Sequence, residues 1–129
     1  MTLKYVLVVN SDVNSQGAYS AYLFARALLK QGHQLTQVFF YQQGTANTNA
    51  LYCPASDETN VVALWQGLAE NFAVDLVSCV AASLRRGIVD EQLAKEQQLA
   101  SDNLAPHFRL GGLGEFVQAS ADADKLIQF

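Results

Sequence analysis

The run Tyr5-Val6-Leu7-Val8-Val9 places five apolar residues in a row near the start of the chain. A continuous apolar run of this length is typical of a strand that is buried on both faces of a parallel sheet. Polar residues 10–17 follow as a loop. Apolar residues then recur at helical spacing up to a stop at Gly32, namely Ala21, Phe24, Ala25 and Leu28. The order of strand, loop and helix predicts the first part of a βαβ unit.

The same alternation continues to the end of the chain. Further strands are predicted at residues 35–41, 74–78, 108–110 and 124–129, with helical patterns between them. Strands that alternate with helices form right-handed βαβ units and a parallel sheet covered on both faces. We therefore predict a single domain, residues 1–129, of the α/β class, with three α/β/α layers and a mainly parallel sheet of about five strands. The strand order does not follow from the sequence.

Helix signals vary in clarity along the chain. Residues 42–55 have the composition of a long loop, after which Ser56 or Asp57 is predicted to cap a helix. Asp90 is the predicted cap of another helix, which continues to about Leu99. Two apolar stripes mark the longer helices: Val61, Leu64, Trp65 and Leu68 in the first, and Leu113, Phe116, Val117 and Ser120 in the second.

Composition excludes several classes of protein. A net charge of −4 disfavours direct binding to a nucleic-acid backbone. No apolar run is long enough for a membrane span or a signal-peptide core, so we expect a soluble cytoplasmic protein. Two cysteines are too few for a disulfide-stapled scaffold, and with His33 and His107 they show no zinc-site spacing. We assign no metal.

The C-terminal segment, residues 110–129, is rich in apolar side chains, whereas charged residues make up only 16% of the chain. Both features favour a stable oligomer, because a small domain has a large surface to cover. The alternative is that the same side chains fill one core.

Cys79 lies at the end of a predicted strand and directly before a short predicted helix that stops at Gly87. Unpaired backbone N–H groups and the helix dipole at such a turn favour a thiolate, the nucleophile that attacks sulfane sulfur. Free cysteine is also often an inert core residue. From position alone the two interpretations are equally supported.

Other candidate sites are weaker. Cys79 and Arg85 share the spacing of cysteine-dependent phosphatases, but the residues between them contain no glycine and are predicted to be helical. Cys53 is either an incidental loop cysteine, which we prefer, or a resolving partner of Cys79. Residues 10–17 hold one glycine and no G-x-G-x-x-G pattern, so a dinucleotide or flavin site is disfavoured and no cofactor is assigned.

Five segments occur together in an order that resembles the DsrE/TusD sulfurtransferase family. They are Val38-Phe-Phe-Tyr41, Pro54-Ala-Ser-Asp-Glu58, Cys79-Val-Ala-Ala-Ser-Leu-Arg-Arg-Gly87, Leu110-Gly-Gly-Leu-Gly114 and Leu126-Ile-Gln-Phe129. The resemblance runs from end to end, and the segment that starts at Cys79 is its most specific part. It implies a parallel sheet flanked by helices and a persulfide on Cys79; it gives no role to Cys53.

The resemblance also implies partners. These are related subunits of the TusB and TusC type in a heterohexamer, a TusA-type sulfur donor and a TusE-type acceptor. It further implies a relay toward 2-thiouridine at the tRNA wobble position, with sulfur oxidation as the alternative pathway. From the sequence we therefore expect a sulfurtransferase whose catalytic residue is Cys79. The contrasting hypotheses are a non-catalytic scaffold subunit and, more weakly, a flavin-binding protein.

Overall fold

The computed structural model describes residues 1–129 and contains one five-stranded sheet in the order β4-β3-β2-β1-β5. Every neighbouring pair of strands is parallel. The strands are β1 Lys4–Val9, β2 Gln34–Phe40, β3 Asp75–Cys79, β4 Phe108–Gly111 and β5 Lys125–Gln128. The helices are α1 Gln16–Lys30, the 3₁₀ helix η1 Gln42–Thr48, α2 Val61–Phe72, α3 Val80–Arg85, α4 Glu91–Glu96 and α5 Leu113–Ala121.

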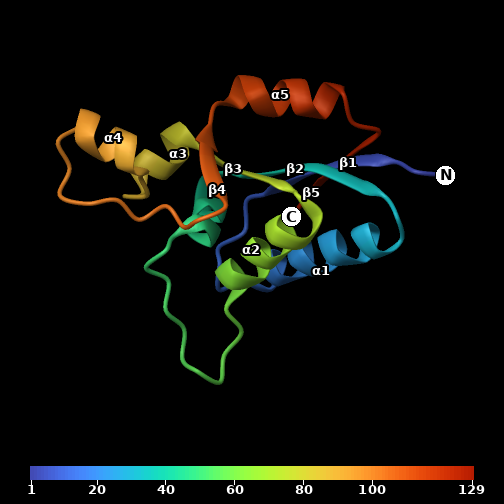
Figure 1. The fold of residues 1–129 in the computed structure, drawn as a ribbon, viewed down its shortest axis with the longest axis horizontal. Coiled ribbons are helices and arrows are strands. Elements are labelled where there is room, and N and C mark those ends of the chain that lie inside the picture. The colour runs from blue at the N-terminus through green and yellow to red at the C-terminus, as the bar shows by residue number, and fades with distance from the viewer.

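Helices cover both faces of the sheet. Figure 1 shows α1 and α2 side by side on one face and α5 on the other. The connection through α5 joins β4 to β5, the two edge strands, so it crosses the whole width of the sheet. The predicted α/β/α layers and parallel sheet are confirmed, and the strand order is a new result.

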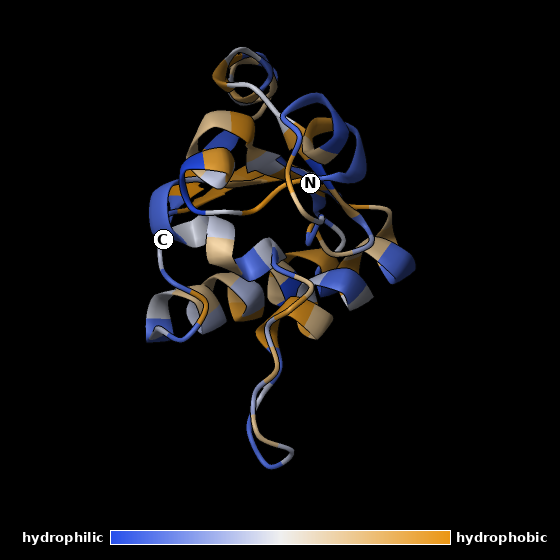
Figure 2. Cartoon of the chain, turned by 90° about the vertical axis from the view of Figure 1, so that its left-hand side faces the viewer, coloured by the Kyte–Doolittle hydropathy of each residue, from blue (hydrophilic) through white to orange (hydrophobic).

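Residues that alternate along the central strands separate two hydrophobic clusters. Leu7, Val38 and Phe40 belong to the larger cluster, together with Trp65 of α2. On the opposite face a smaller cluster contains Val8, Phe39, Val77, Cys79 and Ala82, with Tyr41 and Phe116 packed against it. We call this second set the Cys79 cluster. Figure 2 shows the hydrophobic strands enclosed between the helical layers.

The predicted long loop at residues 42–55 is partly wrong, because its first half is the buried helix η1. Its polar side chains bond within the protein: Asn47 Nδ2 donates to the Ser11 carbonyl at 3.1 Å, and Trp65 Nε1 donates to Asn47 Oδ1 at 3.2 Å. A Cβ on Gly44 would overlap the Val9 carbonyl, so only glycine lets η1 pack this closely on β1. The polar composition of η1 therefore gave no indication in the sequence that this segment packs as a helix.

The predicted caps have mixed outcomes. Asp90 caps α4 as predicted, with Oδ1 accepting from the Leu93 N–H at 2.9 Å, although α4 ends at Glu96. The prediction of Ser56 or Asp57 as the cap of α2 is wrong. The cap is Asn60, whose Oδ1 accepts from the Ala63 N–H at 3.1 Å. Asn60 directly precedes the first helical residue, whereas the earlier polar residues lie in an exposed turn.

The second predicted stripe packs only in part. The α5 helix contains no fully buried residue, and Leu113 and Val117 are 48% and 64% exposed. Only Phe116 of the apolar stripe packs against the Cys79 cluster. The outer face of α5 is thus apolar and uncovered. No helix in the structure is long and apolar enough to cross a membrane.

Candidate functional site

Cys79 is the last residue of β3 and the N-cap of α3, at the carboxyl edge of the parallel sheet. Ligands and reactive groups in open α/β sheets gather at this edge. The thiol makes no capping hydrogen bond. Behind it, the buried Ser78 and Ser83 hydroxyls are hydrogen bonded at 2.7 Å and join the end of β3 to α3. The strand–helix turn predicted for Cys79 is therefore present, and the hydrogen bond between Ser78 and Ser83 stabilises it.

The thiol lies among apolar side chains. Cys79 is 2% exposed and belongs to the Cys79 cluster, to which α5 contributes Phe116. The Phe116 ring stacks on Phe39 with centroids 4.8 Å apart. A sulfur atom of another molecule can therefore reach this thiol only if side chains of the cluster move.

Ion pairs of Arg109 on β4 link the start of α5 to the sheet. Arg109 Nε donates to Asp75 at 2.9 Å, and Arg109 Nη1 lies 2.9 Å from Glu115 of α5. The hydrogen bond that Arg109 donates to Asp75 is the largest cause that raises the pKa of Arg109, so the guanidinium stays charged. Gly111 pairs with Cys79 in the sheet, and a Cβ there would lie 2.5 Å from the Glu115 carboxylate. The α5 helix thus approaches the sheet closely beside Cys79.

The other cysteine is not brought to this site. Cys53 is exposed and belongs to the loop between η1 and α2, which projects on the side of the sheet that carries α1 and α2 (Figure 1). Cys79 packs on the opposite face, with α5. The structure therefore does not support Cys53 as a resolving cysteine in this conformation.

The phosphatase-like spacing has no matching geometry. The residues between Cys79 and Arg85 form α3, and Arg85 is exposed at its last turn. A helix cannot wrap a phosphate as the loop of those enzymes does. The histidines also make separate contacts: His33 Nδ1 accepts from the Leu3 N–H, and His107 lies 3.1 Å from Glu70. No three His, Cys, Asp or Glu residues gather as metal ligands.

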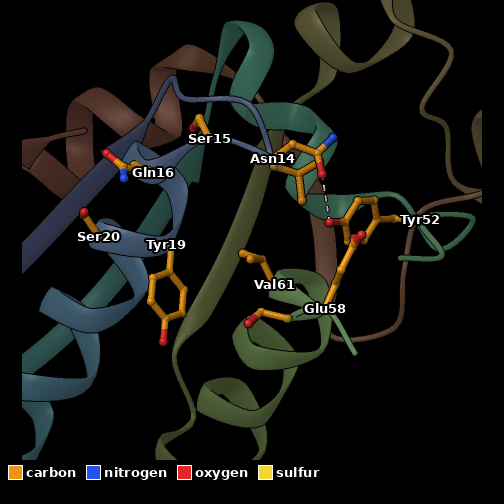
Figure 3. A pocket seen from close by; sticks show the side chains of 10 residues that line it. Asn14, Ser15, Gln16, Tyr19, Ser20, Tyr52, Glu58 and Val61 are labelled. Atoms are coloured by element: carbon orange, nitrogen blue, oxygen red, sulfur yellow. Dashed lines mark hydrogen bonds between the residues drawn. The ribbon is translucent and has the colours of Figure 1, made fainter. Parts of the chain in front are cut away.

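A hollow of about 540 Å³ lies between the start of α1 and the start of α2. Figure 3 shows Tyr19 and Glu58 on its two sides, Val61 at its base and a hydrogen bond of 2.9 Å from Tyr52 to Asn14. The lining residues include no cysteine. This hollow shares no residue with the Cys79 cluster, and part of its lining comes from residues 10–17, the loop at which the sequence disfavoured a dinucleotide or flavin site.

The DsrE/DsrF-like family profile matches residues 3–129. The chain belongs to the DsrE/DsrF-like family. Among its relatives, "Sulfurtransferase TusD" of Proteus mirabilis is 50% identical over 130 residues, and the match covers 100% of both chains. "Sulfurtransferase TusD homolog" of Vibrio cholerae is 50% identical over 128 residues and covers 98% of each chain.

A solved structure of another protein agrees with the fold. The crystal structure of the YchN protein from E. coli covers 100% of both chains with a TM-score of 0.78 at 18% identity. At this identity the match supports the fold alone. The predicted membership of the DsrE/DsrF-like family is confirmed, and the names of the full-length relatives confirm the predicted sulfurtransferase class.

Proposed function

We propose that this sulfurtransferase accepts sulfur as a persulfide on Cys79 and passes it to a thiol of an acceptor protein. The observation that carries the proposal is the position of Cys79 at the strand–helix turn on the carboxyl edge of the sheet. The N–H groups at the start of α3 and a thiol free of capping bonds suit a nucleophilic sulfur there. The relatives named as sulfurtransferases support the reaction class.

The reaction needs two exchanges at sulfur and no net oxidation. The Cys79 thiolate attacks the outer sulfur of a donor persulfide, a new S–S bond forms, and the donor leaves as a thiolate. An acceptor thiolate then attacks the outer sulfur on Cys79, and Cys79 leaves as a thiolate. Protons move to and from solvent, so neither exchange requires a cofactor.

The partners follow from the family and form part of the proposal. Related TusB-type and TusC-type subunits would complete a heterohexamer, with a TusA-type donor and a TusE-type acceptor. The sulfur would finally enter 2-thiouridine at the tRNA wobble position. The name TusD carried by the relatives supports this relay, and the net charge of −4 suits a protein that contacts other proteins rather than RNA. The cytoplasmic location stays a prediction.

A second candidate is a non-catalytic scaffold subunit, which the burial of Cys79 favours. A cysteine that is 2% exposed among apolar side chains is also what an inert core residue looks like. The two candidates differ in one respect only: the scaffold would tolerate loss of the Cys79 sulfur atom.

Transfer of sulfane ³⁵S from a persulfidated donor protein to an acceptor thiol distinguishes the candidates. The Cys79→Ser variant should lose transfer, while Cys53→Ser, the matched control, should keep most of it because Cys53 lies outside the Cys79 cluster. Wild-type transfer by Cys79→Ser would identify the scaffold role. Equal losses in both variants would instead indicate a cycle in which Cys53 takes part.

A further inference from the structure

We infer that Tyr41 is a second functional residue of the transfer site, whose phenol O–H donates a hydrogen bond to the sulfur atom of Cys79 in its thiolate form. The inference rests on the proposed persulfide function. It assigns a role to the last residue of the Val38-Phe-Phe-Tyr41 segment, which the proposed chemistry of Cys79 leaves unused.

The sheet register places Tyr41 beside Cys79. Phe40 pairs with Ser78, so the next residue on each strand is Tyr41 and Cys79. The backbone of Tyr41 stays extended, with φ −133° and ψ 155°, and its N–H donates to the Val9 carbonyl at 3.0 Å. Adjacent strands lie about 4.8 Å apart. The two residues therefore start from neighbouring points at the same edge of the sheet.

The side chain of Tyr41 lies on the same face as the thiol. Its ring packs against the Cys79 cluster, with its centroid 6.2 Å from that of Phe39. Alternation along β2 gives the same result, because Phe39 and Tyr41 are two residues apart and Phe40 belongs to the cluster on the other face. The ring therefore lies on the same face of the sheet as the thiol, among the side chains that pack with it.

Among the residues of the Cys79 cluster and the two packed against it, only Tyr41 and Cys79 have a polar side-chain atom. The hydroxyl of Tyr41, like those of Tyr5, Tyr19 and Tyr22, makes no hydrogen bond within the chain, whereas the hydroxyl of Tyr52 donates to Asn14. A half-buried tyrosine ring usually gives its hydroxyl a partner. Tyr41 is half-buried and packs against the Cys79 cluster, yet its hydroxyl has no partner within the chain.

The reaction offers that donor a partner. Cys79 carries negative charge as the thiolate that attacks, and it regains that charge when it leaves as a thiolate in the second exchange. The other side chains of the cluster are hydrocarbon, apart from the thiol, and apolar surroundings disfavour an unpaired charge. A phenol O–H that donates to the Cys79 thiolate stabilises this charged form without transferring its proton, so the atom balance of both exchanges is unchanged.

The test replaces one oxygen atom. In a Cys53→Ser background, Tyr41→Phe keeps the ring and removes the donor, so unfolding in urea should stay close to the parent protein. Single-turnover release of sulfur from Cys79 to a small thiol, dithiothreitol, should slow about tenfold, the scale of one hydrogen bond to a charged group. In the Tyr41→Phe variant, alkylation of Cys79 by iodoacetamide should reach its maximal rate at a higher pH than in the parent protein. Tyr19→Phe, an exposed tyrosine outside the cluster, is the matched control and should change neither quantity.

Two results would overturn the inference. One is a Tyr41→Phe protein that releases sulfur at the parental rate with an unchanged pH profile. The other is slowing that accompanies a loss of stability while the pH profile stays fixed, since that pattern indicates a purely structural role. Either result leaves the proposed function intact as long as Cys79→Ser still fails to carry sulfur; a Cys79→Ser protein that carries it would contradict the proposed function instead.

Discussion

At the scale of single residues, the two cysteines have opposite environments. Cys79 is buried in the apolar Cys79 cluster, while Cys53 is exposed in the loop before α2. Reaction with a reagent in solution depends first on access to the sulfur atom. The cysteine that we propose to carry sulfur is therefore the less accessible of the two.

Cys53 should react before Cys79 with iodoacetamide in the isolated native chain. Peptide mapping over time should find modified Cys53 first, and Cys79 only on the time scale at which the cluster opens. In urea, where both thiols are exposed, the difference should disappear. Faster native modification of Cys79 would contradict the burial described here.

The position of Cys79 could be predicted from the sequence, but its burial could not. The apolar run before it and Gly87 after it define a strand and a short helix, which are local features. The ring of Phe116 reaches the same cluster from a helix 37 positions further along the chain. That contact depends on the path of the β4–β5 connection, which no local pattern specifies.

At the scale of elements, helix boundaries show the same limit. The stripe through Trp65 correctly identified α2 because its spacing follows the helix period. Its cap was misplaced because Ser56, Asp57 and Asn60 can all accept a hydrogen bond from a helix start. Only the path of the chain decides which of them meets the first turn.

Loss of the Asn60 cap should destabilise the protein. The Asn60→Ala variant removes the acceptor for the Ala63 N–H and should lower the free energy of unfolding by about 1 kcal/mol. Ser56→Ala, the control at the wrongly predicted cap, should leave it within about 0.5 kcal/mol of the parent protein. Urea denaturation measures both. A larger loss in Ser56→Ala than in Asn60→Ala would contradict the assignment.

Phe116 should control access to Cys79. In a Cys53→Ser background, Phe116→Ala removes the ring that stacks on Phe39, so Cys79 alkylation should become faster. The free energy of unfolding should fall by about 2 kcal/mol, less than for a fully buried phenylalanine. Val117→Ala, on the same helix and 64% exposed, serves as the control and should change neither the alkylation rate nor the free energy of unfolding. An unchanged alkylation rate in Phe116→Ala would show that α5 does not cover the thiol.

At the scale of the whole molecule, the apolar surface of the C-terminal part remains uncovered. Leu113 and Val117 on α5 and Leu126 on the edge strand β5 are each at least 47% exposed. The sequence predicted both α5 and β5. Only the strand order of the folded structure shows that β5 is an edge strand. An apolar helix face and an open edge strand both favour association with another chain.

The chain should form a complex with its related subunits. Light scattering of the co-purified proteins should give a mass several times the 14.1 kDa of one chain. Val117→Glu should weaken that complex without unfolding the chain. Leu51→Glu is the control, because Leu51 is also apolar and is 74% exposed in the loop before α2; it should not weaken the complex. A chain that stays monomeric and active in the presence of those subunits would contradict the predicted assembly.

The most direct test of the central claim is the intact mass of the chain after exposure to a sulfur donor. The Cys53→Ser chain, co-purified with its related subunits and incubated with glutathione persulfide, should gain about 32 Da, the mass of one sulfur atom, and lose it on reduction. Tandem mass spectrometry should place the added sulfur on Cys79, and the Cys53→Ser/Cys79→Ser chain should gain nothing. A Cys53→Ser chain that gains no sulfur, or a double variant that gains as much, would contradict the claim that Cys79 carries the sulfur.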